Sequence, residues 1–331
     1  MLGETRHLPY SRSRLLLCPS PFGKITSGLQ VPATGSEWEG GATQMRTLIT
    51  GGTGQLGRAL ARLAPAGIQV IALGSHACDV TDPAAVRAAV ETHRPDLIVH
   101  CAAMTDVDGC ERDPRRAWQV NALGTQHVAA AAVEAGARLV YISTNYVFDG
   151  EAEEPYHEFA RPNPISIYGQ TKLAGEEIVR ALCPQHYIVR TAMLYDETGR
   201  NFVNTMLRLA RERPVLQVVA DQYGNPTYAA DLAEAIWRLV RQPAYGTYHL
   251  VNAGHASWFD WAREAIRLAG LSTPVEPIPA SAYARAARPP RNGVLTSLAA
   301  PALGIILPPW QDALRRNLER RAKLLETSGP V

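Results

Sequence analysis

Short apolar segments alternate with longer amphipathic segments along most of the chain. The apolar segments are rich in β-branched residues and predict strands, at 47–50, 68–73, 97–101, 139–143 and 187–190. The Ala- and Arg-rich segments between them predict helices, at 55–64, 83–92, about 114–135 and about 165–182. This alternation is typical of a parallel sheet with helices on both faces. We therefore predict an α/β fold, with a doubly wound, Rossmann-type sheet over residues 45–190.

Turn-forming residues become denser after Arg190, with Gly199, Pro214 and the segments 224–226 and 288–293. Such punctuation predicts a loop-rich region. Amphipathic stretches within it predict further helices, at 202–212, 230–241, 257–269 and 310–325. We expect residues 191–331 to form mainly a smaller substrate-binding lobe, with some segments returning to the main sheet.

Residues 1–44 lack this periodicity and are rich in Ser, Pro, Gly and Arg. Their one apolar cluster, 15–17, is too short for the apolar region of a signal peptide. We expect a disordered extension, with Met45 as the functional start. A transit peptide and a mis-assigned upstream start would each explain the extension, and both stay open.

Charge and cysteine content limit the kinds of molecule that the protein is expected to bind. Lys and Arg total 33 against 31 Asp and Glu, a net charge of +2, which argues against a nucleic-acid or membrane-surface binder. No apolar run approaches the roughly 18 residues of a membrane span. The 5 cysteines are odd in number and lack metal-ligand spacing, so we predict reduced thiols in a cytoplasmic protein without a metal site.

A glycine-rich turn follows the first predicted strand. Its sequence, Gly51-Gly52-Thr53-Gly54-Gln55-Leu56-Gly57, lies between a strand and a helix. Glycines there let a pyrophosphate approach the backbone N–H groups at the helix N-terminus. The turn therefore predicts a dinucleotide site that includes Gly51, Gly54, Gln55, Leu56 and Gly57.

The end of the second strand bears on the choice of cofactor. NAD-binding chains usually place a carboxylate there to hold the ribose hydroxyl, but this chain has Leu73-Gly74-Ser75-His76. NADPH is therefore favoured, with NADH left open. Asp79 follows a few residues later and is compatible with an exposed loop carboxylate.

Candidate catalytic residues stand at Tyr168 and Lys172, four positions apart and hence on one face of a helix. Thr144 follows a predicted strand, at the edge where open α/β sheets bind ligands. Tyr168 can donate a proton to a carbonyl oxygen, which Thr144 can hydrogen-bond, while the Lys172 ammonium favours the tyrosinate left behind. Taken alone, Asn121 is compatible with a helix-surface amide.

Together these motifs resemble the dTDP-4-dehydrorhamnose reductase family of extended short-chain dehydrogenases. The resemblance covers Met45 to about Leu325 and is carried by five blocks. They are the glycine turn, Ser143–Gly150, Pro164–Glu176, Asp221–Thr227 and Arg288-Pro289. The block Asp221-Gln222-Tyr223-Gly224-Asn225-Pro226-Thr227 makes the resemblance specific to this family.

The resemblance implies a reductase of a nucleotide-linked 4-keto-6-deoxysugar that uses NAD(P)H. It implies that Asp79 and Val80 form the Asp-plus-apolar pair beside adenine and that Asn121 is a relay residue. It also implies that Ala102, Ala103, Thr105 and Asn121 contribute to the cofactor site, beside Tyr168 and Lys172. It also implies a substrate side, formed by Val107, Asn145, Tyr146, Met193 and Arg288. A sugar nucleotide is the expected small-molecule partner, and a homodimer is the assembly that we expect.

Two positions depart from the family pattern and leave the sugar open. Asn145 stands where the family usually has Asp, and Met193 stands where it usually has a substrate-stacking Trp. A non-catalytic protein resembling the regulatory β subunit of methionine adenosyltransferase is therefore one alternative, although Thr144, Tyr168 and Lys172 together favour an enzyme. A nucleotide-sugar epimerase is another, and the 221–227 block argues against it.

Overall fold

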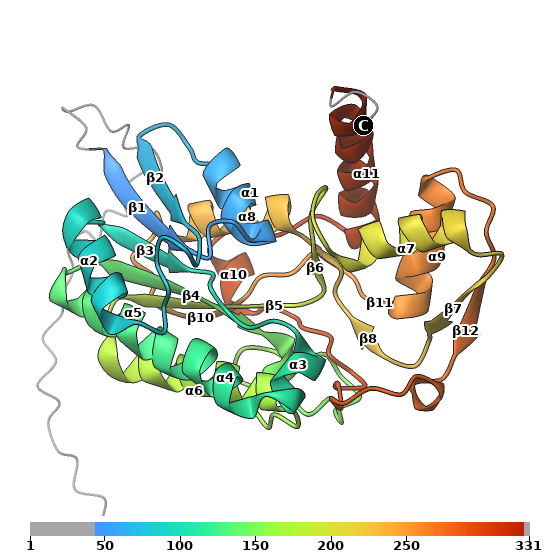
Figure 1. Cartoon of the computed structure of the whole chain (residues 1–331), viewed down its shortest axis with the longest axis horizontal. Coiled ribbons are helices and arrows are strands. Elements are labelled where there is room, and N and C mark those ends of the chain that lie inside the picture. Colours follow the sequence, from blue (N-terminus) through green and yellow to red (C-terminus); the bar gives the residue numbers. More distant parts are fainter. Residues whose placement is uncertain (1–43, 328–331) are drawn as a thin grey trace, which may run out of the picture. The chain divides into compact units, whose positions relative to one another are not determined.

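Six parallel strands form the central sheet of the structure, a computed structural model that describes residues 44–327 (Figure 1). The strands are β1 (Met45–Thr50), β2 (Ile68–Leu73), β3 (Leu97–His100), β4 (Arg138–Thr144), β5 (His186–Thr191) and β10 (Gly246–His249). Their order across the sheet is β10-β5-β4-β3-β1-β2, so the chain leaves β1 toward one edge and then continues from β3 toward the other. The predicted doubly wound α/β fold is confirmed. The predicted disordered extension, residues 1–44, lies outside the described residues except for Gln44.

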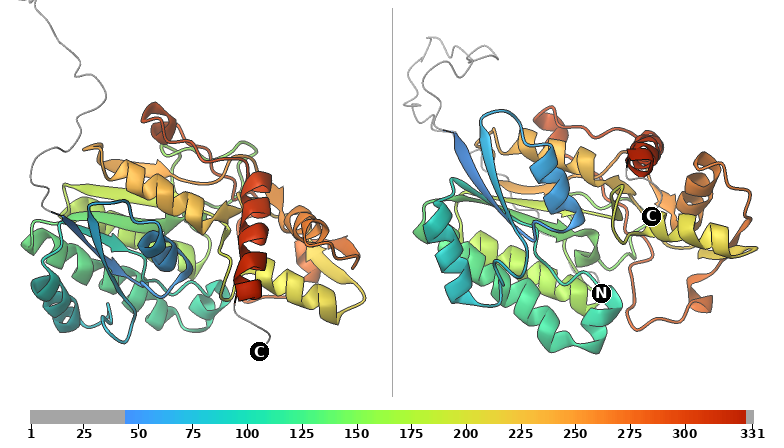
Figure 2. Two further views of the ribbon diagram at one scale, coloured as in Figure 1. Left: turned by 90° about the horizontal axis from the view of Figure 1, so that it is seen from above. Right: turned by 45° about the horizontal axis from the view of Figure 1, so that its top comes forward.

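The apolar character of the strands follows from their position between two helical layers. Every residue of β3 is buried, as expected for a parallel strand covered on both faces. One layer contains α1 (Gln55–Arg62), α8 (Ala229–Leu239) and the short α10 (Ala299–Ala302). The opposite layer contains α2 (Pro83–His93), α5 (Gly124–Glu134) and α6 (Ile167–Leu182). Each layer closes its own hydrophobic core against the sheet (Figure 2).

The helix predicted over residues 114–135 contains a π turn. It consists of α4 (Pro114–Trp118), the π turn Gln119–Leu123 and then α5 without a break. A short helix that the sequence did not reveal, α3 (Val107–Arg112), precedes it. Asp106 and Asp113 cap α3 and α4, because each carboxylate accepts a backbone N–H of the first turn. π turns occur frequently at functional sites, and this one contains Asn121.

The segment after β5 forms the loop-rich part of the structure. Its helices are α7 (Phe202–Glu212), α9 (Trp258–Leu268) and α11 (Trp310–Thr327). Its strands pair in twos, β6 (Leu194–Tyr195) with β9 (Thr227–Tyr228), β7 (Leu216–Val219) with β12 (Val275–Ile278), and β8 (Tyr223–Gly224) with β11 (Ala256–Ser257). The same half of the chain supplies α8 and β10 to the main layers, and β10 pairs in parallel with β5. A domain boundary at residue 190 stays a prediction.

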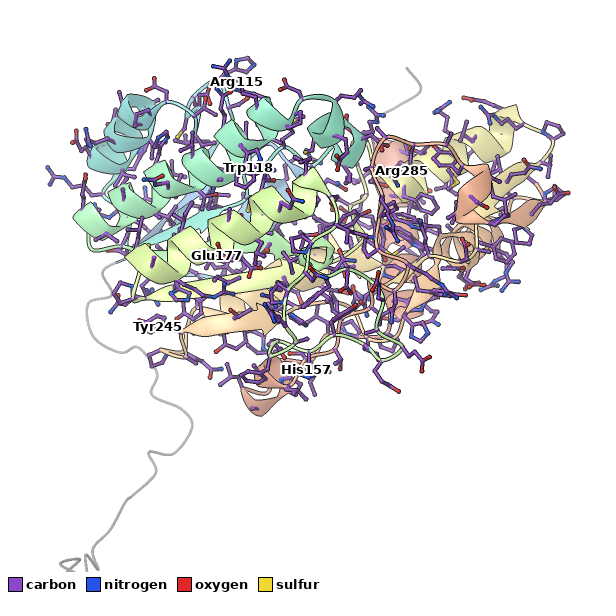
Figure 3. The ribbon with its side chains drawn as sticks, turned by 90° about the horizontal axis from the view of Figure 1, so that it is seen from below. Arg115, Trp118, His157, Glu177, Tyr245 and Arg285 are labelled. Atoms are coloured by element: carbon purple, nitrogen blue, oxygen red, sulfur yellow. The ribbon has the colours of Figure 1, made fainter. Side chains whose placement is uncertain are left out.

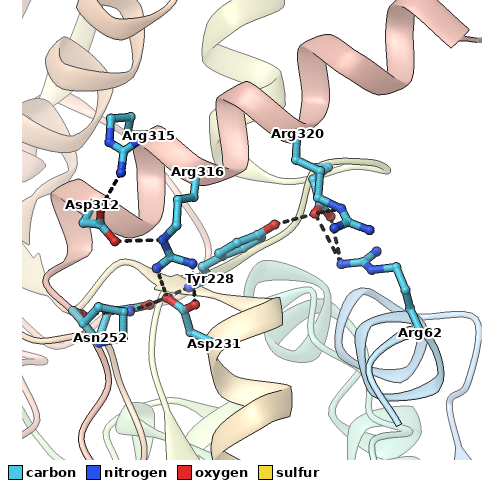
Figure 4. Close-up of polar contacts among 10 residues, drawn as sticks. Arg62, Tyr228, Asp231, Asn252, Asp312, Arg315, Arg316 and Arg320 are labelled. Atoms are coloured by element: carbon cyan, nitrogen blue, oxygen red, sulfur yellow. Dashed lines mark hydrogen bonds and ion pairs between the residues drawn. The ribbon is translucent and has the colours of Figure 1, made fainter. Parts of the chain in front are cut away.

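Ion pairs connect α11 to the main body of the fold (Figure 4). The Arg316 guanidinium donates to both carboxylate oxygens of Asp231 on α8, each at 2.8 Å, and to Asp312 at 2.7 Å. Arg320 lies 2.9 Å from Glu197, whose side chain is fully buried. Since Asp231 is nearly buried, its pairing with Arg316 compensates for the desolvation of the carboxylate.

Between residues 44 and 327, no helix combines the length and the apolar character that a membrane span requires.

Candidate active site

A cavity of about 740 Å³ opens at the carboxyl ends of the central strands. Its lining comes from the glycine turn after β1, the loop after β3, the end of β4, helix α6 and the loop-rich part of the fold. All the predicted site residues line it except Asn121 and Arg288. The site therefore brings together segments from about 50 to 260 of the sequence.

The glycines of the first turn are required by close backbone approach. Gly51 has φ +66°, and a Cβ there would lie 2.7 Å from the backbone nitrogen of Ala102. A Cβ at Gly57 would lie 2.6 Å from the carbonyl oxygen of Gly51. Gly54 occupies the N-cap of α1 without a side-chain cap, so the first N–H groups of the helix remain accessible to an anion. The side-chain oxygen of Gln55 is buried and accepts no hydrogen bond within the described chain.

The loop after β2 forms the next part of the cavity wall. Asp79 accepts hydrogen bonds from the backbone N–H and the hydroxyl of Thr81, at 2.9 and 2.8 Å, and these lower the pKa of its carboxyl. Val80 is buried, whereas Asp79 is exposed at the rim. Arg58 and Arg116 also line the cavity and were missed from the sequence. Arg58 follows the third glycine directly, which is the signal that could have identified it.

The predicted catalytic side chains share one face of α6. Ser166 caps this helix by accepting the N–H of Gly169, so the helix begins at residue 167. Tyr168 and Lys172 both line the cavity, as does Thr144 at the end of β4. Desolvation raises the pKa of Tyr168, while the Thr144 side chain acts in the opposite direction. The phenol is therefore protonated at neutral pH and available as a donor.

Lys172 is almost fully buried at the cavity wall. It is 2% exposed, and its Nζ is 4.0 Å from the centre of the Tyr141 ring. The Tyr141 hydroxyl donates to the carbonyl oxygen of Lys172 at 3.1 Å. Burial lowers the pKa of Lys172 to about 7, against the opposing effect of the Glu176 carboxylate. Its protonation state is therefore sensitive to its neighbours near neutral pH.

A buried ion pair lies one helical turn beyond Lys172. Arg190 donates to both oxygens of Glu176, at 2.8 and 2.7 Å, and Ser143 donates to one of them at 2.6 Å. Burial would raise the pKa of Glu176, but the hydrogen bonds and charge of Arg190 hold it below its usual range. Glu176 thus stays charged and contributes a negative potential at Lys172.

Asn121 has a structural position that the sequence did not predict. Its side chain is fully buried, so the alternative of a helix-surface amide is wrong. The amide accepts the N–H of Met104 at 2.8 Å and donates to the carbonyl of Met104 at 3.2 Å and to the Thr171 hydroxyl at 3.1 Å. Asn121 therefore holds the loop containing Ala103 and Thr105 against α6, and it does so from behind the cavity wall.

Met193, which also lines the cavity, has an unusual backbone conformation. Its φ is +45°, in the left-handed region that side chains rarely adopt. Thr227 donates its N–H to the Met193 carbonyl at 3.1 Å. A Cβ at Gly224 would lie 2.6 Å from the Met193 sulfur. The glycine of the 221–227 block therefore provides the space that the Met193 side chain occupies.

The remaining predicted substrate-side residues have different environments. Val107 and Tyr146 line the cavity, and Asn145 donates its amide to the carbonyl of Gly293 at 2.9 Å. Arg288 is exposed and does not line the cavity. Aromatic residues on this wall were missed, namely Phe202, Trp258 and Trp261. They lie in the predicted helices 202–212 and 257–269, where nothing in the pattern distinguishes an aromatic residue that lines a cavity from one in the core.

Between residues 44 and 327, no group of three or more His, Cys, Asp or Glu side chains could hold a metal ion.

Comparison with known proteins gives one consistent family. The RmlD substrate binding domain matches residues 45–323. The dTDP-4-dehydrorhamnose reductase of Salmonella typhimurium is 41% identical over 291 residues, which cover 83% of this chain and 97% of that protein. The spore coat polysaccharide biosynthesis protein SpsK of Bacillus subtilis is 39% identical over 278 residues, with coverage of 84% and 98%.

Solved structures agree with the sequence comparison. The crystal structure of dTDP-4-dehydrorhamnose reductase (rfbD) from Bacillus anthracis in complex with NADP has a TM-score of 0.82 at 40% identity, covering 84% of this chain and 99% of that one. The UDP-glucose 4-epimerase of Thermus thermophilus, in complex with NAD, has a TM-score of 0.71 at 22% identity, a likeness that concerns the fold alone. The chain therefore belongs to the dTDP-4-dehydrorhamnose reductase family, as its motifs predict.

Proposed function

We propose that this protein uses NADPH to reduce the 4-keto group of a nucleotide-linked 6-deoxysugar, with Tyr168 as the proton donor. The observation that carries the proposal is that Thr144, Tyr168 and Lys172 line the same cavity as the glycine turn. Its relatives in Salmonella typhimurium and Bacillus anthracis are named dTDP-4-dehydrorhamnose reductases, and the second was crystallised with NADP. Membership of this family makes the protein an NADP-dependent oxidoreductase that acts on a sugar nucleotide.

The residues around the glycine turn fit a dinucleotide. Side chains at Gly51 or Gly57 would collide with backbone, and the uncapped N-terminus of α1 offers N–H groups to a pyrophosphate. Gln55 has a buried oxygen without a partner in the described chain, which suits a ligand donor. Arg58 and Arg116 add positive charge at the cavity, and Ser75 in place of a carboxylate suits a 2′-phosphate.

The proposed chemistry divides between the cofactor and the chain. When bound, the reduced nicotinamide supplies a hydride to the carbonyl carbon. The Tyr168 hydroxyl donates its proton to the carbonyl oxygen, which the Thr144 hydroxyl holds by a hydrogen bond. The Lys172 ammonium stabilises the tyrosinate that remains, and it would also hold the ribose of a bound cofactor. Asn121 acts through the loop at 102–105, which it fixes in place.

Replacing Tyr168 with Phe tests the proposal because it removes only the hydroxyl. Turnover of a dTDP-4-keto-6-deoxysugar, followed by NADPH absorbance, should fall roughly 10²- to 10⁴-fold. NADPH binding, measured by calorimetry, should change less than twofold and should exceed NADH binding. Unchanged turnover in the variant would remove Tyr168 from the mechanism. A wild-type protein that binds NADPH but turns over no keto sugar would favour a regulatory protein, and interconversion of sugars without net NADPH consumption would favour an epimerase.

A cytoplasmic location and a homodimer stay predictions of the sequence.

A further inference from the structure

A short segment, residues 290–293, contacts both the loop-rich part and the candidate active site. The chain approaches it through Arg285, which pairs with Asp108 of α3 at 3.1 Å, where the helical layer that contains α6 meets the loop-rich part (Figure 3). Within the segment, Gly293 donates its N–H to the carbonyl of Tyr223 in β8 at 2.8 Å. The backbone of the segment is therefore held by the loop-rich part.

Asn145 connects the same segment to the end of β4. Its amide nitrogen donates to the carbonyl oxygen of Gly293 at 2.9 Å, and its amide oxygen accepts the hydroxyl of Thr144 at 3.2 Å. These partners fix the orientation of the amide, because a carbonyl can only accept and needs the nitrogen opposite it. Asn145 and Thr144 are each 5% exposed, and both line the cavity. The two ends of one amide thus join a candidate reacting group to the segment.

Gly293 leaves the space that this contact needs. A Cβ at residue 293 would collide with the amide nitrogen of Asn145. An ionised carboxylate at residue 145 would have no hydrogen to donate, and its oxygen would face the oxygen of the Gly293 carbonyl. An amide at residue 145 and a glycine at residue 293 are therefore matched to each other.

The hydroxyl of Thr144 has a single hydrogen, which is directed at Asn145. The hydroxyl oxygen also accepts the backbone N–H of Tyr146 at 3.2 Å. The bond to Asn145 is long for a hydroxyl donor, so a substrate carbonyl at closer range can take over the hydrogen. A carboxylate would retain it, because hydrogen bonds to charged acceptors are about twice as strong as those between neutral groups. A neutral amide therefore holds the hydroxyl and can still release it.

We propose that Asn145 is a positioning residue, which fixes the Thr144 hydroxyl relative to Gly293 and releases its hydrogen to the substrate carbonyl. The proposal rests on the proposed function, since it requires Thr144 to hydrogen-bond the 4-keto oxygen. The Asn at position 145, where the family usually has Asp, is then a requirement of this chain, because the partner of residue 145 is a backbone carbonyl. Asn145→Asp should impair the enzyme even though it installs the residue that is usual in the family.

The protonation of the introduced acid separates positioning from a merely structural role. Burial raises the pKa of a carboxyl at this place. When it takes up a proton, it can donate to the Gly293 carbonyl and again offers a neutral acceptor to the Thr144 hydroxyl. The ratio of kcat in Asn145→Asp to kcat in the wild type should therefore rise between about pH 8 and about pH 5. A structural loss would leave this ratio constant.

Other titratable groups are accounted for by the wild type. Tyr146 on the same turn and Tyr168 and Lys172 on α6 also line the cavity, and the wild-type pH profile reports their contribution. Asn292→Asp is the matched control, since the Asn292 amide also donates to a backbone carbonyl from this segment, but to that of Ala152, at 2.8 Å.

The test measures kcat and KM with NADPH and a keto-sugar nucleotide across this pH range. At about pH 8, Asn145→Asp should lower kcat about 10- to 100-fold, because a misplaced reacting group slows the chemical step. NADPH affinity should stay within twofold of wild type, and kcat in Asn292→Asp within threefold. Thr144→Val combined with Asn145→Asp should be no slower than Thr144→Val alone, because residue 145 acts through Thr144. Gly293→Ala, which displaces the amide from its other side, should lower kcat as well.

Several results would overturn the proposal. They are an unimpaired kcat in Asn145→Asp or in Gly293→Ala, a kcat ratio that does not change with pH, and a further loss in the combined variant. An equal loss in Asn292→Asp would assign the effect to a loosened segment instead of Thr144. A wild type that turns over no keto sugar would reject the proposed function and this proposal with it, whereas wild-type turnover with an unimpaired Asn145→Asp would reject this proposal alone.

Discussion

Replacing Tyr141 with Leu should move the alkaline limb of the pH–rate profile to lower pH. The Tyr141 ring lies beneath the Lys172 ammonium, 4.0 Å from Nζ to the ring centre, and favours the charged form through its π electrons. Leucine keeps an apolar side chain on β4 and removes this stabilisation. The charge on Lys172 would then be lost at a lower pH, and with it the stabilisation of the tyrosinate at Tyr168.

The magnitude follows from the surroundings of Lys172. Burial already lowers its pKa to about 7, so small changes move its titration through the neutral range. A cation–π contact contributes roughly 0.5–2 kcal/mol, and one pKa unit corresponds to about 1.4 kcal/mol. The limb should therefore shift by about 0.4 to 1.5 pH units toward acid, with the larger values expected because Lys172 is desolvated.

The assay is kcat against pH with saturating NADPH and keto-sugar nucleotide. Tyr141→Phe is the matched control, since it keeps the ring and loses only the hydroxyl that donates to the Lys172 carbonyl. Melting temperatures of both variants separate loss of packing from the electrostatic effect. Coincident alkaline limbs for wild type and Tyr141→Leu would refute the reasoning, as would an equal shift in Tyr141→Phe.

Two further predictions concern the support of the site. Glu176→Gln should lower the free energy of unfolding by about 3–5 kcal/mol, because it leaves the buried Arg190 charge without its partner. The folded-state pKa of Glu176 is depressed, so its contribution to folding stability is present above the unfolded pKa and is lost as the pH falls. The free energy of unfolding in urea should therefore fall less with acid in the variant than in the wild type. Gly224→Ala should raise KM for the sugar nucleotide and lower the free energy of unfolding by about 1–3 kcal/mol, because its Cβ would lie 2.6 Å from the Met193 sulfur and would displace that side chain. An unchanged KM in steady-state kinetics would contradict a displacement of Met193.

The parts of the fold that were predictable are those that short stretches of sequence determine. Apolar periodicity gave the main strands and most helices, since their burial depends on local spacing. The glycine turn was identifiable because backbone approach excludes side chains at Gly51 and Gly57. Tyr168 and Lys172 were found as a pair because four residues along a helix correspond to one face.

Residues whose environment depends on distant segments were not predictable in the same way. Asn121 is polar and lies in an Ala-rich helical stretch, so nothing local indicates that it faces the backbone of Met104. Arg288 stands in a family motif, yet it is exposed, and it is Arg285 that contacts Asp108. Met193 has a positive φ and its sulfur lies where Gly224 leaves space, and no pattern around residue 193 indicates either feature.

The charge environment of Lys172, the candidate catalytic lysine, depends on the register of two strands as well as on its own motif. Strands β4 and β5 are parallel, and their register places Ser143 opposite Arg190. Both side chains then meet Glu176, which α6 carries one turn after Lys172. A shift of one residue between the strands would turn Arg190 to the other face of the sheet and leave Glu176 buried without its cation. The motif around Tyr168 and Lys172 would be unchanged, but the carboxylate that helps to keep Lys172 charged would become a source of instability.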